Sequence, residues 1–271
     1  MSGLKESINP SIGVMSVATN IYFDYWKKMV QSADTHSTLS DRITFFVFTE
    51  QIQKIESFSK TLQNVSVKGF EVFPYGWPDA TLLRYQIFGE QFSNMTSDAL
   101  MHLDADMIFA TNPWEEVRRL IDKQQICLVQ HPGFWRSKGI EKVIFYLKYP
   151  SFAIKDLRMI LNLGGIGSWE TRVNSAAYVP RKFRNRYFCG ATWFGPRQNI
   201  GEMLTALSTQ VSKDQKNFLI ARWHDESHLN RWAIENDHNV FTPELCYDET
   251  YPQLKKITPG IIAVRKKEMT R

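Results

Sequence analysis

The chain has 271 residues, 43% of them hydrophobic and 13% aromatic, enough for one large core or at most two small ones. A net charge of +5 and a pI near 9.0 suit a phosphate-bearing ligand, an anionic membrane or nucleic acid, without choosing among them. No run of about 18 apolar residues occurs, and MSGLKESINP lacks the basic and apolar regions of a signal peptide, so we expect a soluble, cytoplasmic protein.

The first half of the chain alternates between strand-like and helix-like segments. Four segments have the β-branched and aromatic content of buried strands: 12–18, 42–49, 65–74 and 99–103. Three segments have the apolar spacing of helices: 21–33, 51–62 and 79–92. Asp79 is a candidate N-cap for the last of these helices. The alternating order predicts an α/β fold with a mainly parallel sheet covered by helices on both faces.

The second half is less regular, and no composition break separates it from the first, so we expect one domain. Its glycine cluster LGGIGSW (163–169) does not have the spacing of a dinucleotide-binding turn, which favours a flexible loop. Two basic runs contribute to the charge excess: RKFRNR (181–186) and VRKKEMTR (264–271). The three cysteines are odd in number and lack CxxC spacing, so neither a disulfide framework nor a zinc site is indicated.

The segment LMHLDADMIF (100–109) places two carboxylates, Asp104 and Asp106, inside a hydrophobic run. Ligands of open parallel sheets bind beyond the carboxyl ends of the strands, which is where this pair falls. Mg²⁺ and Mn²⁺ prefer one or two carboxylates combined with the phosphates of a substrate. The pair therefore predicts either a metal site or simply the polar end of a strand.

A second polar segment, WHDESHLNRW (223–232), combines adjacent carboxylates, two imidazoles and two tryptophans. Aromatic faces stack on sugars, and carboxylates bind hydroxyls or stabilise an oxocarbenium-like centre. The alternative is a charged helix start, with Asp225 and Glu226 favoured in the first turn by the helix dipole. The HExxH order is absent, which argues against zinc at His224 and His228.

Together these motifs resemble glycosyltransferase family 6, the retaining α1,3-galactosyl and N-acetylgalactosaminyl transferases that include the ABO blood-group enzymes. The resemblance runs nearly end to end, and it rests on IGVMSVATNIY, HSTLSDRITFFVFTE, HLDADMIF, QHPGFW, WETRVNSAAYVP, YFCGATWFGP and WHDESHLN. It implies a GT-A fold in one catalytic domain (1–271). The nucleotide-binding half would span about 10–110, and the acceptor-binding and catalytic half about 111–271.

The resemblance also implies a role for each matching position. Asp104 and Asp106 would join Mn²⁺, or Mg²⁺, to the diphosphate of a UDP-sugar. Glu226 would be the catalytic residue, and it would bind the acceptor together with His131 and Trp223. The donor-binding set would comprise Val17, Ala18, Thr19, Tyr22, Arg84, Asp104, Ala105, Gly190, Ala191, Thr192, Asp225, Lys266 and Arg271.

Within the donor-binding set, the residues at the end of the first strand would cradle uridine and Asp225 would hold donor-sugar hydroxyls. Gly190 and Thr192 fall where the family chooses between galactose and N-acetylgalactosamine, and the room left by Gly190 favours the latter. Lys266 and Arg271 would cover the diphosphate, unless the tail is simply a solvated terminus. The positive charge is then explained by phosphate, and nucleic acid is not an expected partner.

One segment departs from the family pattern. Between HPGFW and WETRVNS the spacing is longer than in the vertebrate enzymes, and it is filled by residues 136–168. This segment mixes aromatic and aliphatic side chains with lysines, which predicts an amphipathic helical flap that closes over the site or leans on a membrane surface. Packing onto the core is the alternative.

The predicted reaction moves galactose or N-acetylgalactosamine from a UDP-sugar to an oligosaccharide or glycolipid galactoside, in α1,3 linkage and with retention. Two other functions stay open: a GT-A transferase with another UDP-sugar donor, and a catalytically silent sugar-binding protein. A metal-dependent hydrolase is disfavoured because the sequence offers no dedicated water-activating histidine cluster.

Overall fold

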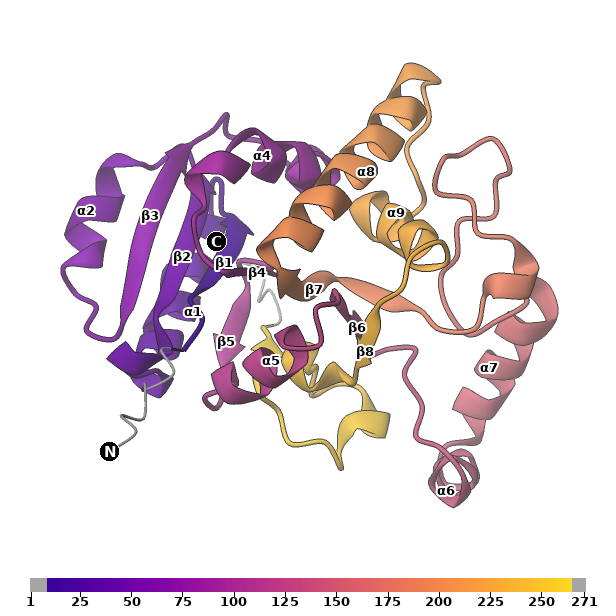
Figure 1. Cartoon of the computed structure of the whole chain (residues 1–271). Helices are drawn as coiled ribbons and strands as arrows, with labels where there is room; N and C mark the ends of the chain where they lie inside the picture. The colour runs from indigo at the N-terminus through magenta and orange to yellow at the C-terminus, as the bar shows by residue number, and fades with distance from the viewer. Residues whose placement is uncertain (1–8, 265–271) are drawn as a thin grey trace, which may run out of the picture.

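The computed structural model describes residues 9–264, which form an α/β fold around one seven-stranded sheet. The strand order is β3-β2-β1-β4-β7-β6-β8, so strands from both halves of the chain share the sheet, and β5 pairs with β9 beside it (Figure 1). The strands are β1 (Ile12–Val17), β2 (Ile43–Thr49), β3 (Val65–Glu71), β4 (Ala99–Leu103), β5 (Met107–Phe109), β6 (Cys127–Gln130), β7 (Phe188–Pro196), β8 (Asn239–Phe241) and β9 (Ile261–Ala263).

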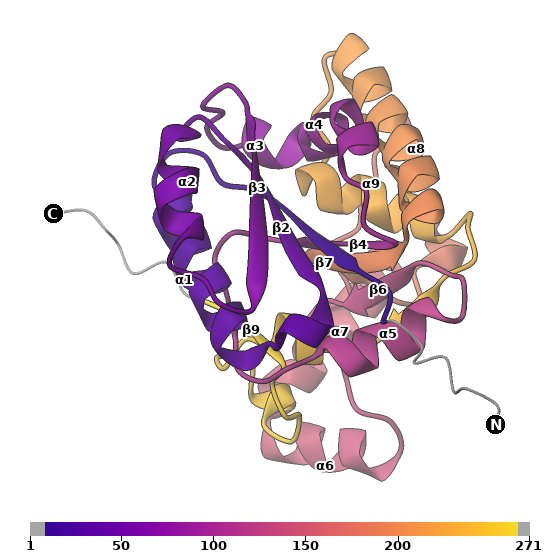
Figure 2. The ribbon, with the colours of Figure 1, turned by 60° about the vertical axis from the view of Figure 1, so that its left-hand side comes forward.

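Helices cover both faces of the sheet, as Figure 2 shows for α1 and α2 on one side and α4 and α8 on the other. They are α1 (Tyr22–His36), α2 (Gln53–Ser59), α3 (Asp79–Leu82), α4 (Arg84–Glu90), α5 (Trp114–Ile121), α6 (Ile140–Lys148), α7 (Pro150–Leu163), α8 (Arg197–Lys216) and α9 (His224–Ala233). No helix among the described residues is both long enough and apolar enough to cross a membrane.

The topology explains where a ligand site can form. The chain runs outward from β1 through β2 to β3 and then returns to the other side of β1 as β4, with parallel pairing throughout. The carboxyl ends of β1 and β4 therefore lie side by side at a point where the strand order reverses. On the far side of β4 the sheet continues with β7, which is antiparallel to it.

The core has two layers because side chains of successive strand residues point to opposite faces. In β1, Ile12 and Val14 join one buried cluster with Trp26 of α1, whereas Met15 joins the other with Leu204 of α8. Burial on both faces is the reason why these strands are continuous hydrophobic runs. The polar residues that follow the strands are thereby confined to the sheet edge.

The α/β fold with a mainly parallel sheet is confirmed, and so are the four predicted strands, whose ends differ by no more than three residues from the predicted ones. The helix predicted over 79–92 is instead two helices, because the backbone leaves regular helical geometry at Leu83. Asp79 as its N-cap was wrong. Pro78 holds the N-cap position, Asp79 is the first helical residue, and the turn starts early because Ala80 N donates to Gly76 O.

Candidate active site

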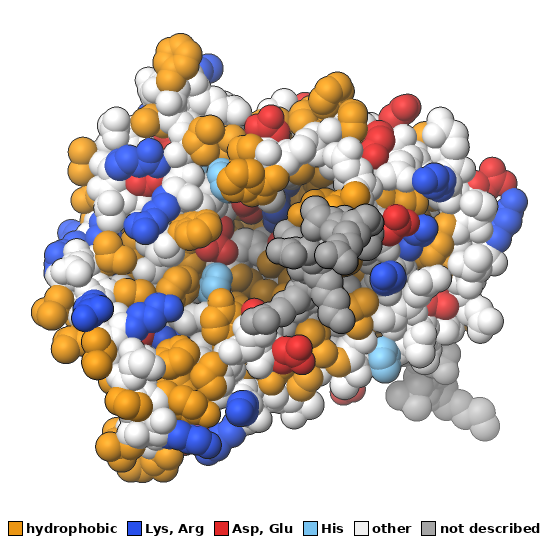
Figure 3. All heavy atoms as spheres, turned by 180° about the vertical axis from the view of Figure 1, so that it is seen from behind, with side chains coloured by type: hydrophobic (Ala, Val, Ile, Leu, Met, Phe, Trp, Pro, Cys, Tyr) orange, Lys and Arg blue, Asp and Glu red, His pale blue; other side chains and the backbone are white. Residues whose placement is uncertain are grey.

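Two adjoining pockets lie at the carboxyl ends of β1 and β4, and Figure 3 shows the hollowed back face, with acidic and histidine side chains at its floor. The first, which we call the strand-end pocket, has a volume of about 330 Å³. Its lining residues are Val17, Thr19, Asn20, Tyr22, Tyr75, Gly76, Trp77, Ala80, Thr81, Asp104, Ala105 and Asp106.

The second, which we call the carboxylate pocket, has a volume of about 360 Å³. It is lined by Trp77, Thr81, Arg84, Asp104, His131, Phe134, Ser168, Gly190, Ala191, Trp223, His224, Asp225, Glu226 and Tyr251. Trp77, Thr81 and Asp104 belong to both pockets, so the two spaces meet there. An elongated ligand that spans both must pass Asp104.

Arg84 of α4 joins the acidic groups of this site. Its Nη1 lies 2.9 Å from Asp104 Oδ1 and 3.4 Å from Asp225 Oδ2, and its side chain is almost entirely buried. Burial by itself would lower the pKa of Arg84, but the negative charges of Asp225 and Asp104 outweigh it and raise the pKa, so the guanidinium stays ionised. One buried cation thus fixes two carboxylates that are 121 residues apart in the chain.

His102 is a site residue that the sequence reasoning missed. Its Nδ1 lies 3.0 Å from Met15 O, while its Nε2 contacts both Arg84 Nη1 and Asp104 Oδ1. Burial, followed by the positive charge of Arg84, lowers the pKa of His102, so the ring is neutral. Because a guanidinium only donates, Nε2 accepts from Arg84 and the proton lies on Nδ1, which donates to Met15 O. The contact with this ring helps to hold the Arg84 guanidinium in position.

The pKa values of Asp104 and Asp225 are shifted in opposite directions. Burial opposes ionisation of Asp104, but the positive charge of Arg84 outweighs it and holds the pKa of Asp104 well below its usual range. For Asp225, burial wins: it raises the pKa to about 7 despite the pull of Arg84, and the charges of Asp104 and Glu226 add to the rise. Asp225 Oδ2 is buried without a hydrogen bond. A ligand hydroxyl in this pocket would supply the missing donor.

Glu226, in the first turn of α9, is held at both carboxylate oxygens. Its Oε1 accepts a hydrogen bond from Tyr187 Oη at 2.7 Å, and its Oε2 accepts one from Gly190 N at 2.9 Å. Burial raises the pKa of Glu226 to about 7, although these two donors oppose the shift. The carboxylate is therefore oriented and poised to change charge near neutral pH. Tyr187 opens the quoted motif YFCGATWFGP, yet nothing in the sequence pointed to its role.

Gly190 of β7 lies close to the first turn of α9. A Cβ at this position would stand 2.9 Å from Asp225 Oδ2 and 3.1 Å from Glu226 Cβ. A side chain there would have to displace the acidic groups, so glycine preserves both their positions and the space in front of them. The neighbouring Thr192 is fully buried, and its hydroxyl donates to Leu245 O, so its side chain does not reach the pocket.

The predicted acceptor residues, His131 and Trp223, line the carboxylate pocket together with Glu226. His131 Nδ1 accepts a hydrogen bond from Gly133 N, and burial lowers the pKa of His131 to about 4, so the ring is neutral with its proton on Nε2. Trp223 is half exposed, and its Nε1 donates to Ser168 Oγ. A neutral N–H donor and an indole face are suited to a sugar hydroxyl and a sugar ring.

Asp104 and Asp106 suit a divalent cation only in combination with a ligand. Both carboxylates line the strand-end pocket, one on each side of Ala105. Nowhere in residues 9–264 do three or more histidine, cysteine or acidic side chains form a group that could hold a metal. Two carboxylates are an incomplete set, and Mg²⁺ and Mn²⁺ commonly complete such a set with substrate phosphate oxygens. The residues present therefore fit a metal that binds together with a phosphate-bearing ligand.

Most positions of the predicted site gather around these two pockets. Ala18 is fully buried behind the strand-end pocket, and Thr192 lies outside the carboxylate pocket. Lys266 and Arg271 lie outside the described residues. The alternative interpretation of WHDESHLNRW is also correct in one respect, because Asp225 and Glu226 do occupy the first turn of a helix.

A profile of glycosyltransferase family 6 matches residues 4–139 and 167–271. Histo-blood group ABO system transferase 1 of Rattus norvegicus is 24% identical over 249 residues, which cover 89% of this chain and 62% of that protein. Globoside alpha-1,3-N-acetylgalactosaminyltransferase 1 of Gallus gallus is 23% identical over 258 residues, covering 92% of this chain and 65% of the relative.

O-antigen biosynthesis glycosyltransferase WbnI of Escherichia coli is 23% identical over 246 residues, covering 90% of this chain and 91% of that protein. The chain thus spans less than two thirds of the two vertebrate relatives and most of the bacterial one. The profile leaves out residues 140–166, which lie within the segment 136–168 that departs from the family pattern in the sequence.

The substitution Asp225→Asn should raise the melting temperature by more at pH 8 than at pH 5. Below its ordinary pKa this carboxyl is neutral whether folded or unfolded. Between that value and about 7 the folded protein holds a proton that the unfolded chain releases, so stability falls as pH rises. The amide should restore on the order of 4 kcal/mol at pH 8, read by thermal unfolding in EDTA.

Glu170→Gln is the matched control, and we expect it to change the melting temperature at pH 8 in the opposite direction. Burial opposes ionisation of Glu170, but hydrogen bonds from Arg172 and from the Arg222 backbone outweigh it and lower the pKa to about 2. Its charge therefore contributes stability above the ordinary glutamate pKa, and that stability is lost as pH falls toward 2. Glu170→Gln should lower the melting temperature at pH 8. An Asp225→Asn protein that is equally destabilised at both pH values would contradict the assignment.

Proposed function

The chain belongs to glycosyltransferase family 6, and from that premise we propose that it is a retaining, metal-dependent transferase of galactose or N-acetylgalactosamine. The donor is a UDP-sugar and the acceptor a galactoside hydroxyl, joined in α1,3 linkage. The observation that carries the proposal is the junction of the two pockets at Asp104. A UDP-sugar has an aromatic base, a charged diphosphate and a hydroxylated ring in the same order as the side chains along these pockets.

The strand-end pocket takes the nucleoside in this proposal. Tyr22, Tyr75 and Trp77 supply aromatic surface for the uracil ring, and Val17 contributes an aliphatic wall. Thr19 Oγ1 donates to Tyr75 O at 2.7 Å, which ties the end of β1 to the loop before α3. The base therefore meets a wall built from two chain segments. The buried Ala18 supports this wall from behind instead of touching the ligand.

The diphosphate lies between the pockets, where Asp104 and Asp106 would hold Mn²⁺ against it. The metal, when bound, supplies positive charge to the departing UDP. Arg84 keeps Asp104 ionised and in place. The Asp104 carboxylate would therefore need no rearrangement to bind the metal. Arg84 also adds a positive charge on the sugar side of the diphosphate.

The donor sugar occupies the inner part of the carboxylate pocket, against Gly190 and Asp225. Asp225 Oδ2 accepts a sugar hydroxyl, which supplies the hydrogen bond that this buried oxygen lacks beside its ion pair with Arg84. The absence of a side chain at Gly190 keeps this space open, and we propose UDP-N-acetylgalactosamine as the preferred donor for that reason. The name of the Gallus gallus relative is in keeping with this choice.

Glu226 is the catalytic residue of the proposal. It either forms a covalent bond to the anomeric carbon as UDP departs, or it stabilises positive charge there while the acceptor attacks from the same face. Both routes need its ionised form, and Tyr187 and Gly190 hold the carboxylate in one orientation for it. His131 and Trp223 then place the acceptor, with His131 Nε2–H donating to an acceptor hydroxyl.

Chelation with EDTA should abolish transfer, and added Mn²⁺ should restore it. Asp104→Asn and Asp106→Asn should each lower kcat by on the order of 10²-fold or more, because the remaining carboxylate is a poorer ligand set. UDP release with a galactoside acceptor is the readout, and Asp237→Asn, at an exposed position, is the matched control. Robust activity in EDTA would show that the metal assignment is wrong.

Turnover of UDP-N-acetylgalactosamine should exceed that of UDP-galactose in the parent protein. Gly190→Ala should lower kcat for both donors by at least about tenfold, since its Cβ would displace Asp225. Gly89→Ala is the control, because a Cβ there meets nothing within 4 Å. Turnover only of another UDP-sugar would indicate a different transferase of the same fold. No UDP release with any acceptor would indicate a silent sugar-binding protein.

Tyr187→Phe should move the acidic limb of the kcat profile to higher pH. The tyrosine hydroxyl stabilises the ionised form of Glu226, so its removal raises the pKa of the carboxyl and delays the active form. Glu226→Gln should lower kcat by on the order of 10²–10⁴-fold at every pH. Tyr25→Phe, in α1, serves as the control. An unshifted profile in Tyr187→Phe would contradict the proposed orientation of Glu226.

A further inference from the structure

Residues 136–168 form an arm, which we call the α6–α7 arm, on one side of the molecule (Figure 1). Its two helices fall within the stretch 140–166 that the family profile does not match. Neither helix contributes a residue to the strand-end pocket or to the carboxylate pocket. The two helices of the arm are therefore an addition whose purpose the sugar-transfer site does not explain.

The inner side of the arm is polar and aromatic. Arg136 donates from Nε and Nη2 to the two carboxylate oxygens of Asp156, at 2.6 and 2.7 Å, and Tyr146 Oη donates to Asp156 Oδ2 at 2.7 Å. The rings of Phe145 and Phe152 pack edge to face against each other, with the guanidinium 5.9 and 5.5 Å from their centroids. Asp156 is the one fully buried residue of α6 and α7. A buried ion pair, and not an aliphatic face, thus holds the arm together.

The aliphatic side chains of the arm point outward instead. Four residues of α6 at positions i, i+3, i+4 and i+7 make one stripe and are 52–78% exposed: Ile140, Val143, Ile144 and Leu147. Four more on α7 are 45–63% exposed: Ile154, Leu157, Ile160 and Leu161. A helix of a soluble protein normally buries such a stripe. In the arm the aliphatic residues are exposed instead, which indicates that this apolar surface binds a partner.

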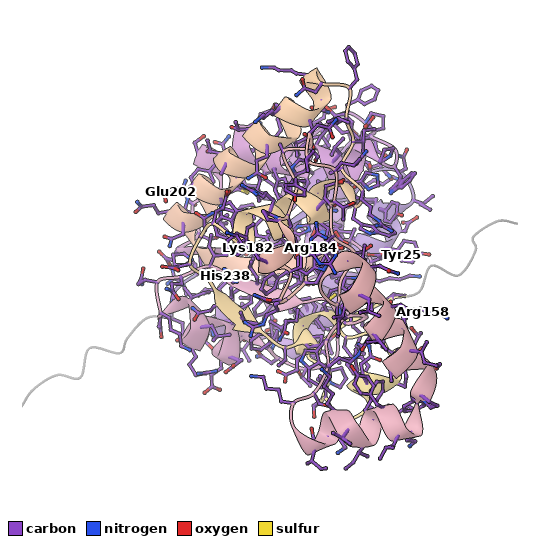
Figure 4. The ribbon with its side chains drawn as sticks, turned by 90° about the vertical axis from the view of Figure 1, so that its right-hand side faces the viewer. Tyr25, Arg158, Lys182, Arg184, Glu202 and His238 are labelled. Carbon is purple, nitrogen blue, oxygen red and sulfur yellow. The ribbon has the colours of Figure 1, made fainter. Side chains whose placement is uncertain are left out.

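The charges around this apolar surface are almost all positive. Five cations are exposed or half-buried on the arm: Lys138, Lys142, Lys148, Lys155 and Arg158. The two acids of this part of the arm are already paired, Glu141 with Lys256 and Asp156 with Arg136. Figure 4 shows Arg158 pointing outward from α7. The arm therefore presents exposed aliphatic residues bordered by unneutralised positive charge.

A hollow of about 490 Å³ lies beside the apolar stripe of α7. Lys155, Arg158 and Arg222 contribute to its wall, and none of these three side chains forms an ion pair within the described part of the chain. Arg222 directly precedes Trp223 of the carboxylate pocket in the chain, and the hollow and this pocket share no lining residue. The charge of the hollow suits the phosphate of a lipid headgroup.

We propose that the α6–α7 arm docks the protein on the surface of an anionic lipid bilayer. The aliphatic stripes enter the headgroup–acyl boundary, and the lysines and arginines contact anionic headgroups beside them. The helices have 9 and 14 residues and lie along the surface without crossing it. A second copy of the chain is a poorer partner, because its arm would bring five like charges against these five.

The test is flotation of the full 271-residue chain with vesicles of phosphatidylcholine alone or mixed equally with phosphatidylglycerol. The protein should bind the mixed vesicles, bind pure phosphatidylcholine at least tenfold more weakly, and be released by high salt. Ile144→Asp combined with Leu147→Asp should lower binding at least tenfold, and Lys142→Glu combined with Lys148→Glu should do the same. All variants keep the basic tail VRKKEMTR, so any contribution of its charge to vesicle binding is the same in each of them.

The matched controls change exposed residues of the same type away from the arm. Leu39→Asp combined with Phe218→Asp, and Lys213→Glu combined with Lys216→Glu, should leave vesicle binding unchanged. Unchanged circular dichroism should show that every variant is folded, and vesicle binding does not depend on the sugar-transfer proposal. Equal binding to both vesicle types, binding insensitive to the arm, or dimerisation that Leu147→Asp abolishes would overturn the proposal.

Discussion

A single buried cation organises the site. The Arg84 guanidinium contacts Asp104 at the end of β4 and Asp225 at the start of α9, and it rests on the neutral ring of His102. Removal of Arg84 would leave the buried carboxylates without their counter-charge, which costs several kcal/mol. The same contacts separate the ionisation of the two aspartates: Asp104 is kept charged at the diphosphate end, and Asp225 gains or loses its proton near neutral pH at the sugar end.

The sheet was predictable because its signal is local. The segments 12–18 and 99–103 are continuous hydrophobic runs, which is what burial on both faces of a parallel sheet requires. The break at Leu83 was not predictable from periodicity, because the residues on both sides of it keep helical spacing. The amphipathic character of α6 was predictable from the spacing of its apolar residues. Which face of the helix meets solvent was not predictable, because that is decided by the Arg136–Asp156 ion pair.

The site residues that could be predicted are those whose side chains are unusual for their surroundings in the sequence. Carboxylates after a hydrophobic run, as at Asp104, and adjacent acids between tryptophans, as at Asp225 and Glu226, stand out. His102 and Tyr187 do not, since an imidazole in a strand and a tyrosine before one are ordinary core residues. Their roles depend on what β1 and α9 bring beside them, at Met15 and Glu226, and that is set by the topology of the sheet.

The central claim is that one nucleotide sugar spans both pockets and passes Asp104 at their junction. A crystal structure of the protein with UDP and Mn²⁺ tests it most directly. The account predicts uracil in the strand-end pocket beside Val17 and Tyr22, the diphosphate at Asp104 and Asp106, and an open space against Gly190 and Asp225 for the sugar. A nucleotide bound in the carboxylate pocket, or with its diphosphate away from both aspartates, would contradict the account.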